Sequence, residues 1–133
     1  MSLLASHVMF VDDHREFAFA AQEFLQGRGY RVSVAHDGME ALDLVAQEVP
    51  DLIIMDVMMP RLDGWQTLES LRKHPLTAQL PVIILTARKS NQDVAQSFAS
   101  GCTWYYGKPI TDFEDFVLVI RQLLENPSAE QPE

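Results

Sequence analysis

The chain has 133 residues, of which 47% are hydrophobic and 22% are charged. This length and composition predict one globular domain with its own core and exclude two domains of ordinary size. The excess of acidic over basic residues gives a net charge of -9, which opposes binding to a nucleic-acid backbone or to an anionic membrane surface. We therefore expect neither nucleic acid nor a membrane among the direct partners of this chain.

The single cysteine, Cys102, cannot form an internal disulfide and is expected to be a small core residue in a reducing compartment. The sequence contains no secretory signal pattern and no apolar run of membrane-spanning length, so a cytoplasmic protein is expected. We interpret residues 1–5 as an N-terminal tail or cloning scar and residues 6–125 as the folded domain. The polar segment 126–133 contains two prolines and is predicted to be a disordered tail.

Five short apolar runs predict β-strands, because each is brief, several are rich in Val and Ile, and most are uninterrupted by polar residues. They lie at about residues 7–11, 30–35, 51–56, 81–86 and 102–106. Segments with helical periodicity separate the runs. The clearest of these carries one apolar stripe at offsets of three and four residues, formed by Phe113, Phe116, Val117, Ile120, Leu123 and Leu124.

Local signals place the ends of several helices. Asp37, Asp63 and Thr111 are each followed three residues later by Glu or Gln, which is the spacing of a capping box at a helix start. Gly27 and Gly101 stand where helices are expected to stop. Strands that alternate with helices through short loops predict an α/β fold with a doubly wound parallel sheet and helices on both faces.

Polar side chains follow four of the five predicted strands. They are Asp12 and Asp13 after the first run, Asp56 at the end of the third, Thr86 at the end of the fourth, and Lys108 with Pro109 after the fifth. The carboxyl ends of parallel strands meet at one edge of the sheet, and α/β sheets bind ligands in the crevice outside that edge. We therefore expect these side chains to form one site.

The residue types at this edge indicate metal-assisted phosphoryl capture. Three carboxylates without a histidine or thiolate partner suit a hard cation, Mg²⁺ with Mn²⁺ as a substitute. Asp56 is the best candidate for a nucleophile toward phosphorus, since Asp12 and Asp13 remain free to hold the metal. The Lys108 ammonium and the Thr86 hydroxyl are expected to bind phosphoryl oxygens, and the Lys108–Pro109 bond is a candidate cis peptide.

Taken in order, these motifs resemble the receiver domain of two-component response regulators, of the chemotaxis-receiver type. The resemblance covers residues 6–125. It rests on Asp12-Asp13, on Asp56 within Asp-Val-Met-Met-Pro-Arg-Leu-Asp-Gly, on Thr86-Ala87, and on Tyr105 ahead of Lys108-Pro109. The resemblance implies a flavodoxin-like sheet with the strand order 2-1-3-4-5.

The resemblance also implies a role for each site residue. Asp56 would accept a phosphoryl group from a histidine kinase or a histidine phosphotransfer protein. Asp13, Asp56 and the backbone carbonyl of Met58 would bind Mg²⁺, and Asp12 would act through a water molecule. Lys108 would then pair with the phosphoryl group.

In this family, signalling couples the site to a protein-binding surface. Thr86 would move toward the phosphoryl group and Tyr105 would turn inward, which would change the face formed by the fourth helix, the fifth strand and the fifth helix. Alternation places Trp104 and Tyr106 on one face of the last strand and Tyr105 on the other. Core burial is the default for at least one of Trp104 and Tyr106, whereas a Trp104 exposed beside Tyr105 would indicate a partner-binding patch.

Other classes of protein fit the sequence less well. A phosphohydrolase of the haloacid dehalogenase type needs a second aspartate two residues after its nucleophile, where this chain has Met58, and its nucleophile follows the first strand. A nucleotide- or flavin-binding module would need a glycine-rich loop after the first strand. A degenerate receiver that never takes phosphate is disfavoured because every catalytic position is filled. The kinase, the output, the oligomeric state and any further domains stay open.

Overall fold

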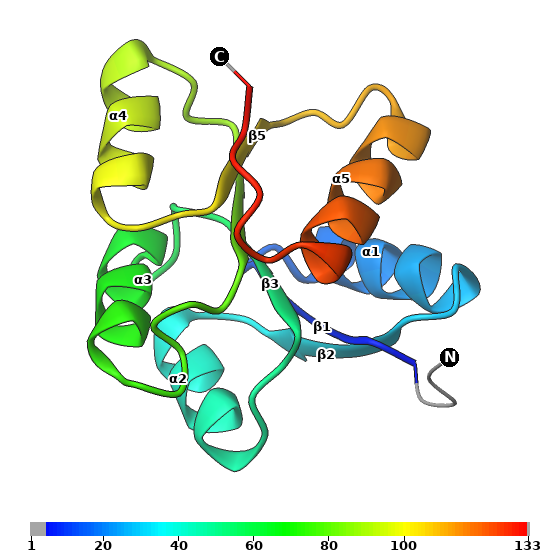
Figure 1. Ribbon diagram of the computed structural model, residues 1–133, viewed down its shortest axis with the longest axis horizontal. Helices are drawn as coiled ribbons and strands as arrows, with labels where there is room; N and C mark the ends of the chain where they lie inside the picture. Colours follow the sequence, from blue (N-terminus) through cyan, green and yellow to red (C-terminus); the bar gives the residue numbers. More distant parts are fainter. Residues whose placement is uncertain (1–4, 133) are drawn as a thin grey trace.

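A computed structural model describes residues 5–132, in which strands and helices alternate along the chain (Figure 1). The elements are β1 (His7–Val11), α1 (Arg15–Gly27), β2 (Arg31–Ala35), α2 (Gly38–Gln47), β3 (Leu52–Met55), α3 (Gly64–Lys73), β4 (Val82–Thr86), α4 (Asn91–Ala99), β5 (Trp104–Gly107) and α5 (Phe113–Glu125). The predicted N-terminal tail, apart from Ala5, lies outside the described residues.

The five strands form one parallel sheet in the order β2-β1-β3-β4-β5. Helices α1 and α5 cover one face, and α2, α3 and α4 cover the other (Figure 1). This arrangement confirms the predicted doubly wound α/β fold. It brings the carboxyl ends of β1, β3, β4 and β5 to one edge, as the strand-end motifs require.

Residues in register across the sheet show why the strands are apolar throughout. One row runs through Val34, Phe10, Ile54, Ile83 and Trp104, and all five pack in the core beneath α1 and α5. The residues next along each strand face the opposite way, because side chains alternate in a β-strand. Both faces of the sheet are covered by helices, so neither set can be polar.

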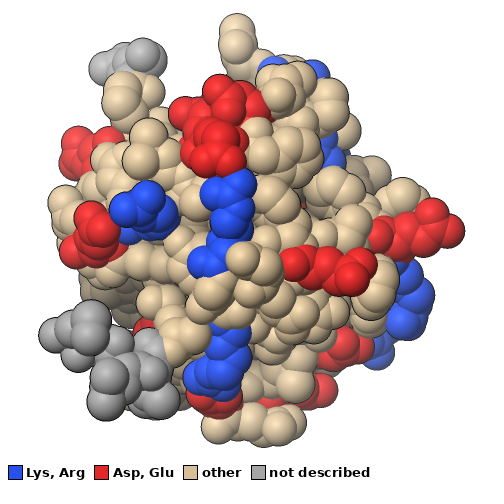
Figure 2. Space-filling view, turned by 90° about the vertical axis from the view of Figure 1, so that its right-hand side faces the viewer, with Lys and Arg blue, Asp and Glu red and all other residues tan. Residues whose placement is uncertain are grey.

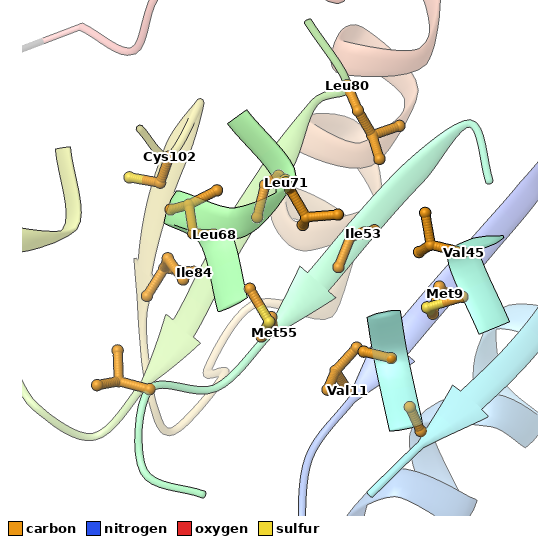
Figure 3. Close-up of a cluster of buried hydrophobic side chains, with 14 residues drawn as sticks. Met9, Val11, Val45, Ile53, Met55, Leu68, Leu71, Leu80, Ile84 and Cys102 are labelled. Carbon is orange, nitrogen blue, oxygen red and sulfur yellow. The ribbon is translucent and has the colours of Figure 1, made fainter. Parts of the chain in front are cut away.

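The second core lies between the sheet and helices α2 and α3 (Figure 3). Met9, Ile53 and Met55 from the sheet pack there with Leu68 and Leu71 from α3. Met55 immediately precedes Asp56, so the end of β3 is fixed by buried side chains before the chain enters the site.

The alternation predicted for β5 is confirmed. Trp104 is 7% exposed and packs in the α1/α5 core, where Tyr106 also packs, whereas Tyr105 packs against the core on the other face. Because Trp104 is buried, it does not form the exposed aromatic patch that would have marked a partner surface.

Two of the three predicted capping positions begin helices as expected. Asp63 and Gln66 form a reciprocal capping box at the start of α3, and Asp37 accepts a hydrogen bond from the Glu40 amide at the start of α2 (2.8 Å). The third position, Thr111, is wrong by one residue, because α5 is capped by Asp112. Its carboxylate is the stronger acceptor and accepts from the amide three residues later.

Helices α1 and α4 both end close to the glycines at which the sequence predicted that they would stop. Gly27 is the last residue of α1, but the left-handed conformation occurs two residues later, at Gly29 (φ 94°). Gly101 has φ 109° after α4, as expected of a glycine that ends a helix.

Two residues of the segment predicted to be a disordered tail contact the domain. Ala129 packs against the α1/α5 core, and the Gln131 side chain bonds to the backbone of β5. Glu133 lies outside the described residues.

Charged side chains of both signs share the surface formed by α1 and α5. Figure 2 shows Lys and Arg lying beside Asp and Glu on this side of the molecule, and an ion pair joins Arg28 to Glu114. Within residues 5–132, every helix is too short or too polar to cross a lipid bilayer.

Cys102 is buried, as predicted. We expect its ionisation to lower the free energy of unfolding at alkaline pH. Burial raises the pKa of the Cys102 thiol from 9.0 to about 12, and nearby Arg72 offsets only part of this rise. Because the pKa of this thiol is higher in the folded than in the unfolded chain, the stabilisation from burying the neutral thiol is complete below pH 9. This stabilisation is lost as the pH rises toward 12. The parent should lose about 2 kcal/mol of free energy of unfolding through this thiol between neutral pH and pH of about 10.5, and Cys102→Ala should not show this part of the loss.

Urea unfolding of the parent and of Cys102→Ala, near neutral pH and near pH 10.5, measures this effect. The difference in free energy of unfolding should shift in favour of the variant at the higher pH. An equal difference at both pH values would contradict the prediction.

Candidate functional site

Three predicted site residues meet at the carboxyl edge of the sheet. The Lys108 ammonium, from the segment after β5, donates to Asp12 Oδ2 after β1 (2.8 Å) and to Asp56 Oδ2 after β3 (2.9 Å). Asp12 is 1% exposed and Asp56 is 9% exposed. Residues separated by up to 96 positions in the sequence therefore share one ammonium group at the centre of the edge.

The two carboxylates determine the charge state of Lys108. Burial alone lowers the pKa of the ammonium, but the hydrogen bonds and charges of Asp12 and Asp56 outweigh it and raise that pKa overall. Lys108 is therefore a cation at neutral pH, set between two acidic side chains. This is the charge arrangement that an incoming phosphoryl group can exploit, since it offers both a nucleophilic carboxylate and a cation.

The loop after β3 holds Asp56 from the other side. Asp56 Oδ1 accepts from the backbone amide of Val57 (2.6 Å) and more distantly from that of Met58 (3.4 Å). The Gly64 amide donates to the Val57 carbonyl (2.9 Å), which fastens the start of α3 to the same loop. A Cβ atom on Gly64 would lie 2.2 Å from the Asp56 carbonyl oxygen, so this close approach requires glycine.

The three carboxylates predicted to bind metal are arranged differently from one another. Asp12 Oδ1 accepts from the His14 amide (2.9 Å) and Oδ2 from Lys108, whereas Asp13 is exposed on the loop after β1. Across residues 5–132, acidic, His and Cys side chains do not gather in a group of three that could hold a metal ion. The oxygen donors of Asp12 and Asp56 are nevertheless of the type that Mg²⁺ prefers.

Thr86 lies at the same edge, at the end of β4, and is 1% exposed. Its hydroxyl oxygen accepts from the Arg88 amide (3.2 Å), and its backbone carbonyl accepts from the Lys108 amide (2.8 Å). Thr86 thus contacts both the loop after β4 and the segment that carries Lys108. The peptide bond between Lys108 and Pro109 is cis, the isomer that the sequence suggested.

Tyr105 connects β5 to the loop that follows Thr86. Its hydroxyl donates to the backbone carbonyl of Arg88. Burial raises the pKa of this hydroxyl, and the charge of Asp93 raises it further, so the phenol is a donor at neutral pH. The two residues expected to form the switch are therefore both bonded to Arg88.

Sequence reasoning placed Arg88 beside the pocket but missed two aromatic side chains, Phe17 next to Lys108 and Trp65 next to Arg88. The Lys108 ammonium lies 4.5 Å from the centre of the Phe17 ring on α1, within the range of a cation–π contact. The Arg88 guanidinium bonds to Asp93 (3.0 Å) and lies 4.9 Å from the centre of the Trp65 ring. An aromatic residue in an amphipathic helix is usually a core residue, so the spacing of Phe17 gave no signal of its position beside Lys108.

A doubly wound sheet with two buried aspartates and a lysine at its carboxyl edge defines a receiver-type signalling domain. The comparisons with known proteins agree, since residues 8–121 match the family described as the response regulator receiver domain. The chain belongs to this family.

Relatives and solved structures show how far the similarity extends. The chain is 44% identical over 117 residues to the transcriptional regulatory protein CpxR of Escherichia coli, which covers 88% of this chain and 48% of that protein. It is 37% identical over 125 residues to the probable transcriptional regulator ycf29 of Porphyra purpurea, covering 94% of this chain and 59% of the relative. The chain therefore spans about half the length of the curated relatives it matches.

Solved structures confirm the receiver fold. The Francisella response regulator 1452 receiver domain superposes with a TM-score of 0.82 at 32% identity, covering 90% of this chain and 97% of that one. The chemotaxis protein CheY4 of Vibrio cholerae superposes with a TM-score of 0.83 at 29% identity, covering 89% and 98%.

Proposed function

We propose that Asp56 accepts a phosphoryl group from a histidine kinase or a histidine phosphotransfer protein, in a reaction that requires Mg²⁺. The observation that carries this proposal is the shared ammonium of Lys108, which lies 2.9 Å from Asp56 and 2.8 Å from Asp12. This places a nucleophile, a second carboxylate and a cation within one buried edge. Family membership supports the same role for the aspartate that follows β3.

The transfer forms one bond and breaks another at phosphorus. An Asp56 carboxylate oxygen attacks in line, and the bond between phosphorus and the donor imidazole nitrogen breaks, with its electron pair leaving on that nitrogen. The product is an acyl phosphate on Asp56. Lys108 then bonds to a phosphoryl oxygen and stabilises the charge that develops during transfer. Later attack by water returns Asp56 to a free carboxylate, so the domain catalyses only its own phosphorylation and hydrolysis.

The residues present suit a magnesium ion. We propose that Asp12, Asp13, Asp56 and the backbone carbonyl of Met58 hold Mg²⁺, with Mn²⁺ as a substitute, because all supply oxygen donors. When bound, the ion supplies positive charge to the transferring group. The Lys108 ammonium, which contacts Asp12 and Asp56, would also donate to the phosphoryl oxygens.

The signal is proposed to leave the site through Thr86 and Tyr105. Thr86 would turn its hydroxyl from the Arg88 amide to a phosphoryl oxygen, and Tyr105 would turn inward. The new acceptor oxygens provide the differential contacts that a shift between two conformations needs. The face formed by α4, β5 and α5 would then bind a downstream protein or effector domain.

The setting of this function follows from charge and family. The net charge of -9 opposes nucleic acid and membrane as direct partners of this chain. We place the protein in the cytoplasm, where a histidine kinase could reach it. A phosphohydrolase mechanism would lack its general acid, because Met58 carries a thioether where an acid is needed. Asp56 also follows the third strand and not the first.

Intact mass after incubation with Mg²⁺ and acetyl phosphate tests the proposal. The parent should gain one phosphoryl group, and Asp56→Asn should gain none. Asp43→Asn is a matched control, since Asp43 is an exposed residue of α2, and it should gain phosphate like the parent. A folded parent that gains no phosphate and binds no beryllofluoride would identify a degenerate receiver instead.

A further inference from the structure

The C-terminal segment lies along the free edge of β5. Figure 1 shows residues after α5 returning beside β5, between α4 and α5. β5 is an edge strand, since its sheet neighbour on the inner side is β4. Edge strands expose unpaired amides and carbonyls that can bind another chain segment.

The Gln131 side chain occupies this edge as a neighbouring strand would. Its Oε1 accepts from the Tyr105 amide (2.8 Å), and its Nε2 donates to the Tyr105 carbonyl (2.9 Å). One side-chain amide thus satisfies both backbone groups of a single residue, as a residue of an adjacent antiparallel strand would. Ala129 anchors the same segment by packing against the α1/α5 core.

The segment also borders α4. A hollow of about 400 Å³ lies between residues 128–131 and the side chains of Phe98, Cys102 and Thr103. Gln131 is itself only partly exposed. Residues 126–132 therefore cover the middle of the face that α4, β5 and α5 form.

We propose that the β5 edge is an interaction surface for an extended segment that carries a side-chain amide, and that residues 126–132 occupy it until Asp56 is phosphorylated. The release step rests on the proposed function of Asp56. The occupation of the β5 edge by residues 126–132 is independent of that function.

A continuous set of contacts joins the phosphoacceptor edge to this segment. The Arg88 amide donates to Thr86 Oγ1 (3.2 Å), the Arg88 carbonyl accepts from the Tyr105 hydroxyl, and the Tyr105 backbone binds Gln131. Movement of Thr86 toward a phosphoryl group breaks the first of these bonds. The loop that binds the Tyr105 hydroxyl then moves together with Tyr105, and β5 can change the position of the backbone groups that Gln131 requires.

Amide hydrogen exchange at Tyr105 tests whether the segment occupies the edge. In the 133-residue chain carrying Gln131→Ala, the Tyr105 amide should exchange about tenfold faster than in the parent, which corresponds to about 1.4 kcal/mol of lost protection, the scale of one or two net hydrogen bonds. Glu130→Ala is the matched control, because Glu130 is the exposed neighbour of Gln131, and it should exchange like the parent. Equal exchange in the parent and Gln131→Ala would overturn the proposal.

Beryllofluoride with Mg²⁺ tests the release step. The Tyr105 amide of the loaded parent should exchange as fast as that of Gln131→Ala. Coupling between two sites is reciprocal, so Gln131→Ala should also bind beryllofluoride up to about tenfold more tightly. A loaded parent that keeps Tyr105 protected would overturn the release step. A parent that fails to bind beryllofluoride would refute the proposed function of Asp56, while the exchange of Gln131→Ala would still decide whether the segment occupies the edge.

Discussion

Replacement of Lys108 by methionine is expected to slow phosphoryl uptake from acetyl phosphate by about a hundredfold, the usual cost of removing one group that stabilises developing charge. Methionine keeps a similar length without the ammonium that contacts Asp12 and Asp56. The rate of mass gain in the presence of Mg²⁺ measures the effect. Lys108→Arg should not restore the parent rate, because a planar guanidinium cannot place a compact charge between the two carboxylates.

Lys73→Met is the control for this series. Lys73 is an exposed residue in the last turn of α3, so its loss removes one positive charge at a distance from the site. It should take up phosphate at the parent rate. A comparable loss in both variants would assign the effect to net charge and not to Lys108.

Lys108→Met is also expected to lower the free energy of unfolding by about 3 kcal/mol at neutral pH, because it leaves two buried carboxylates without their cation. Adding Asp56→Asn to Lys108→Met should recover part of the loss. Lys108 has a raised pKa in the fold, so its stabilising effect is complete below the ordinary lysine pKa and is lost as the pH rises through the raised value. Urea unfolding near neutral pH measures both variants.

Replacement of Gly64 by alanine is expected to lower the free energy of unfolding by about 3 kcal/mol, at the upper end of the usual cost of overpacking. The added methyl group would lie 2.2 Å from the Asp56 carbonyl oxygen and 2.9 Å from Val57 Cα. Both are backbone atoms, which cannot rotate away as a side chain would. The shift should also displace Asp56 and slow phosphoryl uptake in the protein that remains folded.

Gly27→Ala provides the comparison for Gly64→Ala. A Cβ atom at Gly27 would have no neighbour within 4 Å, and its φ is not in the left-handed region. Its free energy of unfolding should match the parent or exceed it by about 0.5 kcal/mol, since alanine reduces the entropy of the unfolded chain. Equal destabilisation by the two substitutions would show that loss of glycine, and not the clash with the Asp56 backbone, is the cause.

Hydrophobic patterning predicted the sheet well because both of its faces are buried. Residues such as Ile54 and Ile83 need no alternation when helices cover each face, so short apolar runs located all five strands. The order of strands came from resemblance to a family, since patterning alone does not specify which strands are neighbours. The meeting of Asp12, Asp56 and Lys108 followed from one rule, that the carboxyl ends of parallel strands share an edge.

Features that depend on competition between neighbouring groups were harder to predict. Thr111 and Asp112 are both residue types that cap helices, and the choice of Asp112 depends on the relative strength of two acceptors. The position of Gln131 depends on a free strand edge far away in the sequence, which composition does not reveal. Composition alone therefore predicts disorder for such a segment, whether or not one of its side chains meets a strand edge.

The two outer strands of the sheet differ in how they resist aggregation. β2 begins with Arg31, whose ion pair with Glu48 keeps charge at that edge. β5 has the sequence Trp-Tyr-Tyr-Gly, which carries no charge to repel another strand. By occupying the Tyr105 amide and carbonyl, the Gln131 side chain therefore also hinders pairing of β5 with a strand of another molecule. Removing this side chain should lower the concentration up to which the protein stays monodisperse.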